Sequence, residues 1–180
     1  MPTHHETIAL AKRIMAANPL YLDTETTGLD NWSEIIEIAI VEADGKVAFQ
    51  SLIKPSNPIP TGATRIHGID NNLVSDAPRW YQIWPEIQRI LSGRHVGIYN
   101  AEFDQRMLRQ SNAIYQLPFK LSEGTNFFCI MNLYKDYQGS YRFQSLDSAQ
   151  AFFNIPIRNS HRAVEDTLLA RAVFERIAAG

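Results

Sequence analysis

Apolar residues follow two different spacings along the chain, and these spacings predict its strands and helices. Dense runs of apolar and β-branched residues predict strands at 20–26, 35–43 and 47–54. Asp44-Gly45 lies between the last two runs and is typical of a tight turn, so we expect an antiparallel hairpin there.

Helical spacing of apolar residues marks most of the remaining chain. It predicts helices at 6–17, 78–91, 101–110, 145–153 and 161–177, and Pro85 is expected to mark a start or a kink in the second of them. A short strand at 95–100 runs directly into the third helix. The proline-rich segment 54–62 is expected to be a loop, and the aromatic-rich segment 115–143 a mixture of loop and short helix.

A strand meander followed by alternating helices and strands predicts an α/β fold, with a mixed β-sheet flanked by α-helices. The chain has 180 residues, of which 45% are hydrophobic and 20% charged, as in an ordinary globular protein. We find no repeat and no linker, so we expect a single domain over residues 1–180.

Charge and cysteine content narrow the class of protein. The net charge of −2 disfavours a protein that coats nucleic acid, but it disfavours less an enzyme that grips only a chain end. The single cysteine, Cys129, excludes an internal disulfide. No segment has the pattern of a signal peptide or a membrane span, so a cytoplasmic location is expected.

Two acids lie near the end of the first predicted strand at positions that share one face. Side chains two residues apart on a strand point the same way, so Asp23 and Glu25 converge while Thr24 points to the opposite side. Two carboxylates this close repel each other unless a cation lies between them. The alternative is that the strand has already ended and that both acids lie in water.

The same segment also has the spacing of a calcium-binding EF-hand loop. The ligand positions of such a loop would be occupied by Asp23, Glu25, Thr27 and Glu34, with Gly28 at the turn. An EF-hand loop requires flanking helices, whereas both flanks here are apolar and rich in strand-forming residues. We therefore interpret the match as accidental.

Two further acids are predicted on helices. Asp104 lies one turn into a helix that the Asn100 side chain is expected to cap. The alternative to a functional role is that Asp104 only stabilises the helix dipole, as acids in a first turn do. Asp166 lies at the end of the apolar stripe of the last helix, so it must be paired or bound to an ion. His161 can share a site with Asp166 only if it lies on the loop or in a frayed first turn.

Taken together, the motifs DTETTGL (23–29), YNAEFD (99–104) and HRAVED (161–166) resemble the DEDDh 3′→5′ exonuclease family, which includes the proofreading epsilon subunit of bacterial DNA polymerase III and its free-standing relatives. IHGI at 66–69 is also similar to that family. The resemblance extends over nearly the whole chain and implies a ribonuclease H-like fold.

The resemblance implies a role for each acid and for the histidine. Asp23, Glu25 and Asp166 would hold one divalent ion, Asp23 would bridge to a second ion, and Asp104 would support that second ion. His161 would act as the general base on the attacking water. The catalytic positions of the family are all present, which argues against an inactive homologue.

The resemblance also implies contacts to the substrate. Leu29 and Phe103 would pack against the terminal bases, while His67 and the backbone near Thr26 would hold the terminal nucleotide. Asn100 matches the asparagine of the family. Tyr99 stands where many members have histidine, a departure that we interpret as one of packing.

Several arginines near the expected site are candidates for phosphate contacts, or are solvated surface charges: Arg65, Arg106, Arg109 and Arg162.

The chemistry of phosphodiester hydrolysis explains the residue types. Negative charge develops on the attacking and the leaving oxygen, and two cations about 3.5–4 Å apart stabilise both. Oxygen ligands select hard ions, so Mg²⁺ or Mn²⁺ is expected. Histidine suits the role of base because its usual pKa lies near working pH.

The predicted function is 3′→5′ exonucleolytic release of nucleoside monophosphates from single-stranded or frayed DNA ends. The alternatives are an RNA-directed enzyme of the oligoribonuclease or RNase T type, a calcium-binding module, and a non-catalytic accessory domain. The chain ends soon after the last predicted catalytic helix, which favours a free-standing role in repair or trimming over polymerase-bound proofreading.

Overall fold

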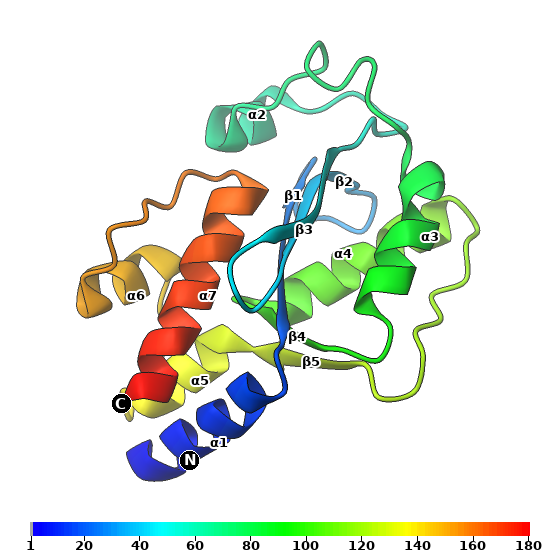
Figure 1. Ribbon diagram of the computed structural model, residues 1–180. Helices are drawn as coiled ribbons and strands as arrows, with labels where there is room; N and C mark the ends of the chain where they lie inside the picture. The colour runs from blue at the N-terminus through cyan, green and yellow to red at the C-terminus, as the bar shows by residue number, and fades with distance from the viewer. Residues whose placement is uncertain (1) are drawn as a thin grey trace.

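A five-stranded mixed sheet forms the centre of the molecule (Figure 1). The computed structural model describes residues 2–180. The strands have the order β3-β2-β1-β4-β5, and their bounds are β1 Leu20–Thr26, β2 Ile35–Val41, β3 Val47–Leu52, β4 His95–Ile98 and β5 Asn126–Cys129. β1, β2 and β3 pair antiparallel, so the expected hairpin is confirmed, while β4 is parallel to both β1 and β5.

Helices cover both faces of this sheet (Figure 1). α3 and α4 lie on one face, α7 lies on the other with α1, α5 and α6 beside it, and α2 belongs to the long connection between β3 and α3. Their bounds are α1 His4–Ala16, α2 Thr61–His67, α3 Trp80–Leu91, α4 Ala101–Ile114, α5 Ile130–Tyr137, α6 Leu146–Phe153 and α7 Ala163–Ala179. The predicted α/β architecture, a mixed sheet flanked by helices, is therefore confirmed.

The alternation of side chains along β1 decides what each face of the sheet carries. Leu20 and Leu22 belong to the core beneath α3 and α4, whereas Tyr21 belongs to the core beneath α7. Continuing this alternation places Thr24 on the α4 side, and Asp23 and Glu25 on the α7 side. The acids are thus carried by a fully formed central strand, and the alternative of an ended strand in water is wrong.

The carboxyl ends of β1 and β4 meet at one edge of the sheet because these two strands are parallel. β2 lies antiparallel on the other side of β1, so the direction of the chain changes at this point of the sheet. Ligand sites in α/β sheets form outside such strand ends. The pairing of β1 with β2 is also irregular between Glu25 and Thr26, and such irregularities occur next to functional sites.

Three local predictions differ from the structure. α2 begins at Thr61, at the end of the proline-rich segment, and β5 runs through the segment predicted to be loop and helix. β5 is too short for its spacing to be recognised in the sequence. α3 begins at Trp80, so Pro85 lies inside the helix and does not mark its start. Because proline has no N–H, the helix loses only the hydrogen bond that residue 85 would donate to the Tyr81 carbonyl.

No helix within residues 2–180 is both long enough and apolar enough to span a membrane.

Candidate active site

Three carboxylates from two distant segments meet at the carboxyl end of β1. Ligand oxygens of Asp23, Glu25 and Asp166 all lie within 4.8 Å of one another. Asp23 and Glu25 come from the same face of β1, and Asp166 comes from the first turn of α7, which packs on that face. A group of oxygen ligands at this spacing could hold a divalent metal ion.

Asp166 is held in place by the backbone around it. It is buried, with 5% of its surface exposed, at the end of the apolar stripe predicted from the sequence. Its Oδ1 accepts a hydrogen bond of 3.0 Å from the Ser160 N–H, and its own N–H donates to the Arg162 carbonyl at 3.0 Å. The loop before α7 therefore folds onto the carboxylate and fixes its direction.

Asp104 approaches the site from the other face of the sheet. It lies in the first turn of α4, is 4% exposed, and accepts a hydrogen bond of 2.7 Å from the Thr24 hydroxyl. Burial raises the pKa of Asp104 to about 7, and the hydrogen bond from Thr24 opposes this rise. Asp104 lies outside the group of three carboxylates, although its charge still acts on them.

The acids of the site destabilise one another's charged forms. Burial, followed by the charges of Asp104, Glu25 and Asp166, raises the pKa of Asp23 well above its usual range. Burial and the charge of Asp166 likewise raise the pKa of Glu25 to about 8. Such shifts arise where like charges are gathered without a compensating cation. The donor set and its charge therefore fit a divalent metal ion, which would relieve the repulsion.

His161 lies on the loop that precedes α7, as it must if it is to share a site with Asp166. Its side chain is exposed. Burial raises the pKa of Asp166, and the Ser160 N–H and the charge of His161 oppose this rise. Its backbone has φ +52°, in the left-handed region that is unfavourable for a residue with a side chain. The surrounding loop must hold this conformation, because the residue does not prefer it.

Most of the predicted substrate-binding residues line a single cavity beside the carboxylates. The cavity has a volume of about 270 Å³, and Thr26, Leu29, His67 and Phe103 contribute to its walls together with Glu25. Leu29 is 77% exposed and the Thr26 hydroxyl donates to the Gly28 carbonyl at 2.7 Å. The structure therefore gathers these residues at one place, next to the acids.

His67 carries an unpaired donor in this cavity. Its Nδ1 accepts a hydrogen bond of 3.0 Å from the Ile69 N–H, so the proton of the neutral ring lies on Nε2. Within residues 2–180, the buried Nε2 atom has no hydrogen-bond partner. Burial lowers the pKa of His67, and the nearby backbone of Thr26 opposes this shift. An unsatisfied buried donor in a binding cavity is a group that a ligand can pair with.

Asn100 and Tyr99 behave differently from the other predicted residues. Asn100 occupies the N-cap position of α4 and is exposed, but its side chain makes no capping hydrogen bond with any described residue, so the predicted capping bond is wrong. It is not among the residues that line the cavity. Tyr99 is buried and its hydroxyl donates toward the carbonyls of Gln144 and Ser145, a packing role.

The loop after β1 is braced by α4. Arg106 donates to the Leu29 carbonyl at 3.3 Å, and the Gln110 amide donates to the Asp30 carbonyl at 3.0 Å. The Arg106 guanidinium also lies 5.2 Å from the centre of the Phe103 ring. This loop presents Trp32, which is 81% exposed and was not recognised from the sequence.

Sequence reasoning also missed Glu37, a buried acid on β2. Arg162, one of the candidates for phosphate contacts, is engaged by Glu37 in an ion pair of 2.6 Å. The available signal was a lone glutamate inside the otherwise apolar run IIEIAIV, because a buried charge must have a partner.

The EF-hand interpretation fails on its flanks, which are the strands β1 and β2. Glu34, the expected bidentate calcium ligand, is buried and accepts hydrogen bonds from the Ser56 N–H at 2.8 Å and from the Tyr115 hydroxyl at 3.3 Å. Its oxygens therefore hold neighbouring segments of the fold together by hydrogen bonds.

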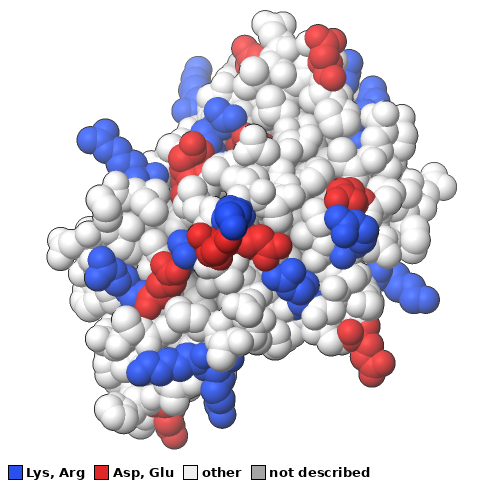
Figure 2. All heavy atoms as spheres, in the orientation of Figure 1, with Lys and Arg blue, Asp and Glu red and all other residues white. Residues whose placement is uncertain are grey.

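Charges of both signs are intermingled on the face that Figure 2 shows, where Asp and Glu side chains gather near the middle with single Lys or Arg side chains around them. This face carries no continuous basic surface, in agreement with the net charge of −2. Strong non-specific binding to phosphates is not expected from such a surface.

Most of the sequence matches a known protein family. The sequence model of the RNase_T family, described as exonuclease, matches residues 20–174. The chain therefore belongs to the RNase_T exonuclease family, and the resemblance carried by the three motifs is confirmed.

Two relatives illustrate this membership. The protein called Uncharacterized exonuclease CP81, from Escherichia phage 186, is 32% identical over 183 residues, which cover 94% of this chain and 93% of that protein. DNA polymerase III subunit epsilon of Rickettsia felis is 29% identical over 170 residues, which cover 89% of this chain and 74% of that protein.

Solved structures confirm the ribonuclease H-like fold. Exonuclease X in complex with 5′ overhanging duplex DNA superposes with a TM-score of 0.68 at 27% identity, covering 89% of this chain and 90% of that one. E. coli Exonuclease I in complex with a dA16 oligonucleotide gives a TM-score of 0.74 at 16% identity, covering 89% of this chain and 42% of that one.

Proposed function

We propose that this exonuclease removes nucleotides from the 3′ end of DNA by hydrolysis of the terminal phosphodiester, as a member of the DEDDh type. The observation that carries the proposal is the position of the three-carboxylate group, Asp23, Glu25 and Asp166, beside the cavity that contains the His67 donor. A site for a cation next to a site for a nucleotide is what such an enzyme requires.

The acids would hold divalent ions, Mg²⁺ or Mn²⁺. Asp23, Glu25 and Asp166 would bind one ion and Asp104 would support a second near Asp23. When bound, such ions stabilise the charge that develops on the attacking and the leaving oxygen. The oxygen-only donor set favours these hard ions over zinc.

The remaining residues bind the substrate and move a proton. His161, on the exposed loop before Asp166, would accept the proton of the attacking water. The His67 Nε2–H would donate to the terminal nucleotide, and Leu29 and Phe103 would contact its base. These contacts fix the end of the chain, so that only the last phosphodiester reaches the acids.

The relatives support DNA as the substrate. Exonuclease X, at 27% identity, is seen in complex with duplex DNA that carries 5′ overhangs, and the Rickettsia felis relative is a subunit of DNA polymerase III. We therefore propose DNA in preference to RNA, with single-stranded or frayed ends as the preferred form and a role in DNA repair or trimming.

Digestion of matched DNA and RNA oligonucleotides tests this function. Oligonucleotides of identical sequence, labelled at the 5′ end, are incubated with the protein and Mg²⁺ or Mn²⁺, with EDTA as a blank. We expect a ladder that shortens from the 3′ end, with DNA consumed faster than RNA. Faster loss of RNA would assign the protein to RNA processing. If neither ion supports cleavage, the result would favour the alternative of a non-catalytic accessory domain.

A pair of acidic substitutions provides the internal control. Asp166→Ala removes a member of the three-carboxylate group and is expected to abolish cleavage. Glu34→Gln, which changes a buried acid of the EF-hand-like spacing, is expected to leave cleavage nearly intact. The opposite result would support the calcium-loop interpretation.

A further inference from the structure

Glu37 is a buried acid beside the site that the proposed mechanism does not use. It lies on β2 directly opposite Glu25 in the antiparallel pairing, and only 7% of its surface is exposed. At this position its charge raises the pKa of Glu25, so it makes the site harder to charge. A buried carboxylate in such surroundings needs a partner of its own.

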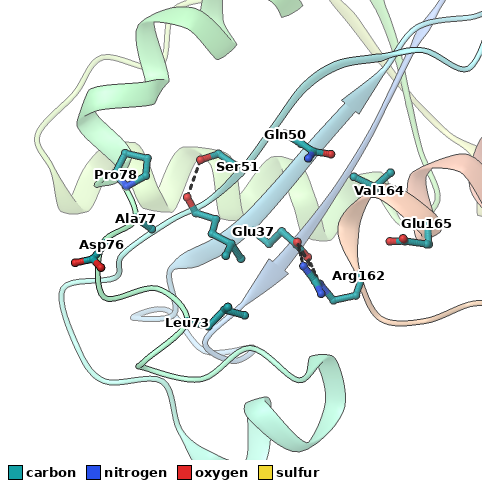
Figure 3. Close-up of a pocket in the computed structure, with 11 residues that line it drawn as sticks. Glu37, Gln50, Ser51, Leu73, Asp76, Ala77, Pro78, Arg162, Val164 and Glu165 are labelled. Carbon is teal, nitrogen blue, oxygen red and sulfur yellow. Dashed lines mark hydrogen bonds and ion pairs between the residues drawn. The ribbon is translucent and has the colours of Figure 1, made fainter.

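The partners of Glu37 come from the start of α7 (Figure 3). Arg162 donates from Nη2 to Oε1 at 2.6 Å and from Nε to Oε2 at 3.0 Å, and the Ala163 N–H donates to Oε2 at 3.0 Å. Both oxygens of Glu37 are therefore occupied by protein donors. The oxygens of Asp23, Glu25 and Asp166, by contrast, face one another within 4.8 Å.

This contact caps α7 from a neighbouring strand. Ala163 is the first residue of α7, and the first N–H groups of a helix have no partner within it. The N-cap residue is Arg162, whose side chain forms no capping hydrogen bond among residues 2–180. Glu37 supplies the missing acceptor, and a carboxylate at a helix N-terminus is also favoured by the helix dipole.

The capped turn carries the residues that the proposed chemistry needs. Asp166 lies within this first turn and its N–H bonds to the Arg162 carbonyl, while its carboxylate accepts from Ser160. His161, in the left-handed conformation, lies between these two anchors. Residues 160–166 therefore form one hydrogen-bonded unit, and Glu37 is its attachment to the sheet.

We propose that Glu37 is a positioning residue, which holds Asp166 and His161 against β1 by capping α7 and pairing with Arg162, and that it is not a metal ligand. The expected effect of Glu37 on the rate of hydrolysis rests on the proposed function. The contacts of Glu37 with Arg162 and Ala163, here called the clamp, are made by protein atoms alone.

Substitutions at both ends of the pair separate this role from others. The variants are Glu37→Ala, Arg162→Ala and the double variant; Arg162 borders a cavity of about 600 Å³, so shortening it does not disrupt a packed core. The control is Glu42→Gln, which breaks a more exposed ion pair of 2.8 Å with Arg94, outside the site. Because Arg162 acts through its contact with Glu37, the double variant is expected to be no worse than Glu37→Ala, which also loses the bond from the Ala163 N–H.

Hydrogen exchange of the metal-free protein gives the direct measurement. We expect Glu37→Ala to raise amide exchange at residues 163–167 by roughly tenfold or more, with little change at residues 169–177. Glu42→Gln should leave both segments as they are. A general loss of stability would instead raise exchange along the whole of α7, and unchanged exchange at 163–167 would overturn the clamp.

Kinetics and metal binding complete the test. Hydrolysis of a nitrophenyl ester of a nucleoside 5′-monophosphate is expected to lose about 10–100-fold in kcat in both single variants, with little change in KM. If Glu37 were a ligand, Mn²⁺ binding measured by calorimetry would be lost in Glu37→Ala and kept in Arg162→Ala. Should the wild type cleave no nucleotide substrate, the proposed function fails, while the exchange measurement still decides whether the clamp exists.

Discussion

The Thr24 hydroxyl donates a hydrogen bond of 2.7 Å to Asp104, on the opposite side of β1 from Asp23 and Glu25. One strand thus uses both faces at the same point, because alternate side chains present carboxylates toward α7 and a hydroxyl toward α4. Asp104 is fixed to β1 through this bond. The acid on α4 and the acids on the strand are therefore mechanically connected.

Removal of this hydroxyl should cost stability. Thr24→Val preserves the shape of the side chain but leaves the buried Asp104 oxygen without its donor, which we expect to lower the free energy of unfolding by about 1–3 kcal/mol. The pKa of Asp104, already raised by burial to about 7, should rise further. Urea unfolding measures the loss. Thr24→Ser retains a hydroxyl and is the control, and equal stability of the two variants would contradict the assignment.

Metal-free protein should become less stable as the pH rises. Burial and neighbouring acids raise the pKa of Glu25 from 4.5 to about 8, so the folded state binds more protons than the unfolded state between these values. Stability then falls with rising pH across that window. Thermal unfolding in EDTA should show this fall, while Mn²⁺ should stabilise the protein increasingly from pH 5 to pH 8. A Tm shift by Mn²⁺ that does not vary with pH would refute the explanation.

His161→Ala should lose turnover without losing binding. As the proposed general base, His161 is expected to account for about 10²–10⁴-fold in kcat. KM and Mn²⁺ affinity should change little, and added imidazole should restore part of the rate. His5→Ala alters an exposed histidine on α1 and serves as the control. Unaltered turnover of His161→Ala would remove this residue from the mechanism.

Trp32 provides an optical signal for substrate binding. It is 81% exposed, whereas Trp80 and Trp84, on the core-facing side of α3, are 1% and 2% exposed. Binding of a single-stranded oligonucleotide to the Asp166→Ala variant should quench the exposed tryptophan, and Trp32→Phe should abolish that signal. Trp32→Ala in active protein should raise KM about tenfold with kcat unchanged, because stacking on a base is lost. Identical quenching in Trp32→Phe would show that the loop makes no contact.

Sequence patterns were sufficient where a single element decides the answer. The bounds of β1, the shared face of Asp23 and Glu25, and the core-facing position of Asp166 all follow from the period of one strand or one helix. Helix geometry requires His161 to lie outside the regular helix only if it shares a site with Asp166, and α7 begins at Ala163, two residues after the predicted start of the last helix.

Features that depend on contacts between elements were not accessible. The role of Glu37 requires the pairing register of β1 with β2 and the point at which α7 begins, and neither is encoded locally. β5 is short and is stabilised by its parallel pairing with β4. The direct hydrogen bond between Thr24 and Asp104 joins residues 80 positions apart. Local spacing carries no information about such distant partners.

Helix α4 bears Asp104 near its start and supports the carbonyls of Leu29 and Asp30 through Arg106 and Gln110 farther along. A small slide or tilt of this helix would therefore move Asp104 and the edge of the cavity at Leu29 together. Under the proposed function, we therefore expect discrimination among terminal bases and the rate of hydrolysis to change together. Selection for variants with altered base preference should repeatedly recover changes in α4 that also alter the catalytic rate.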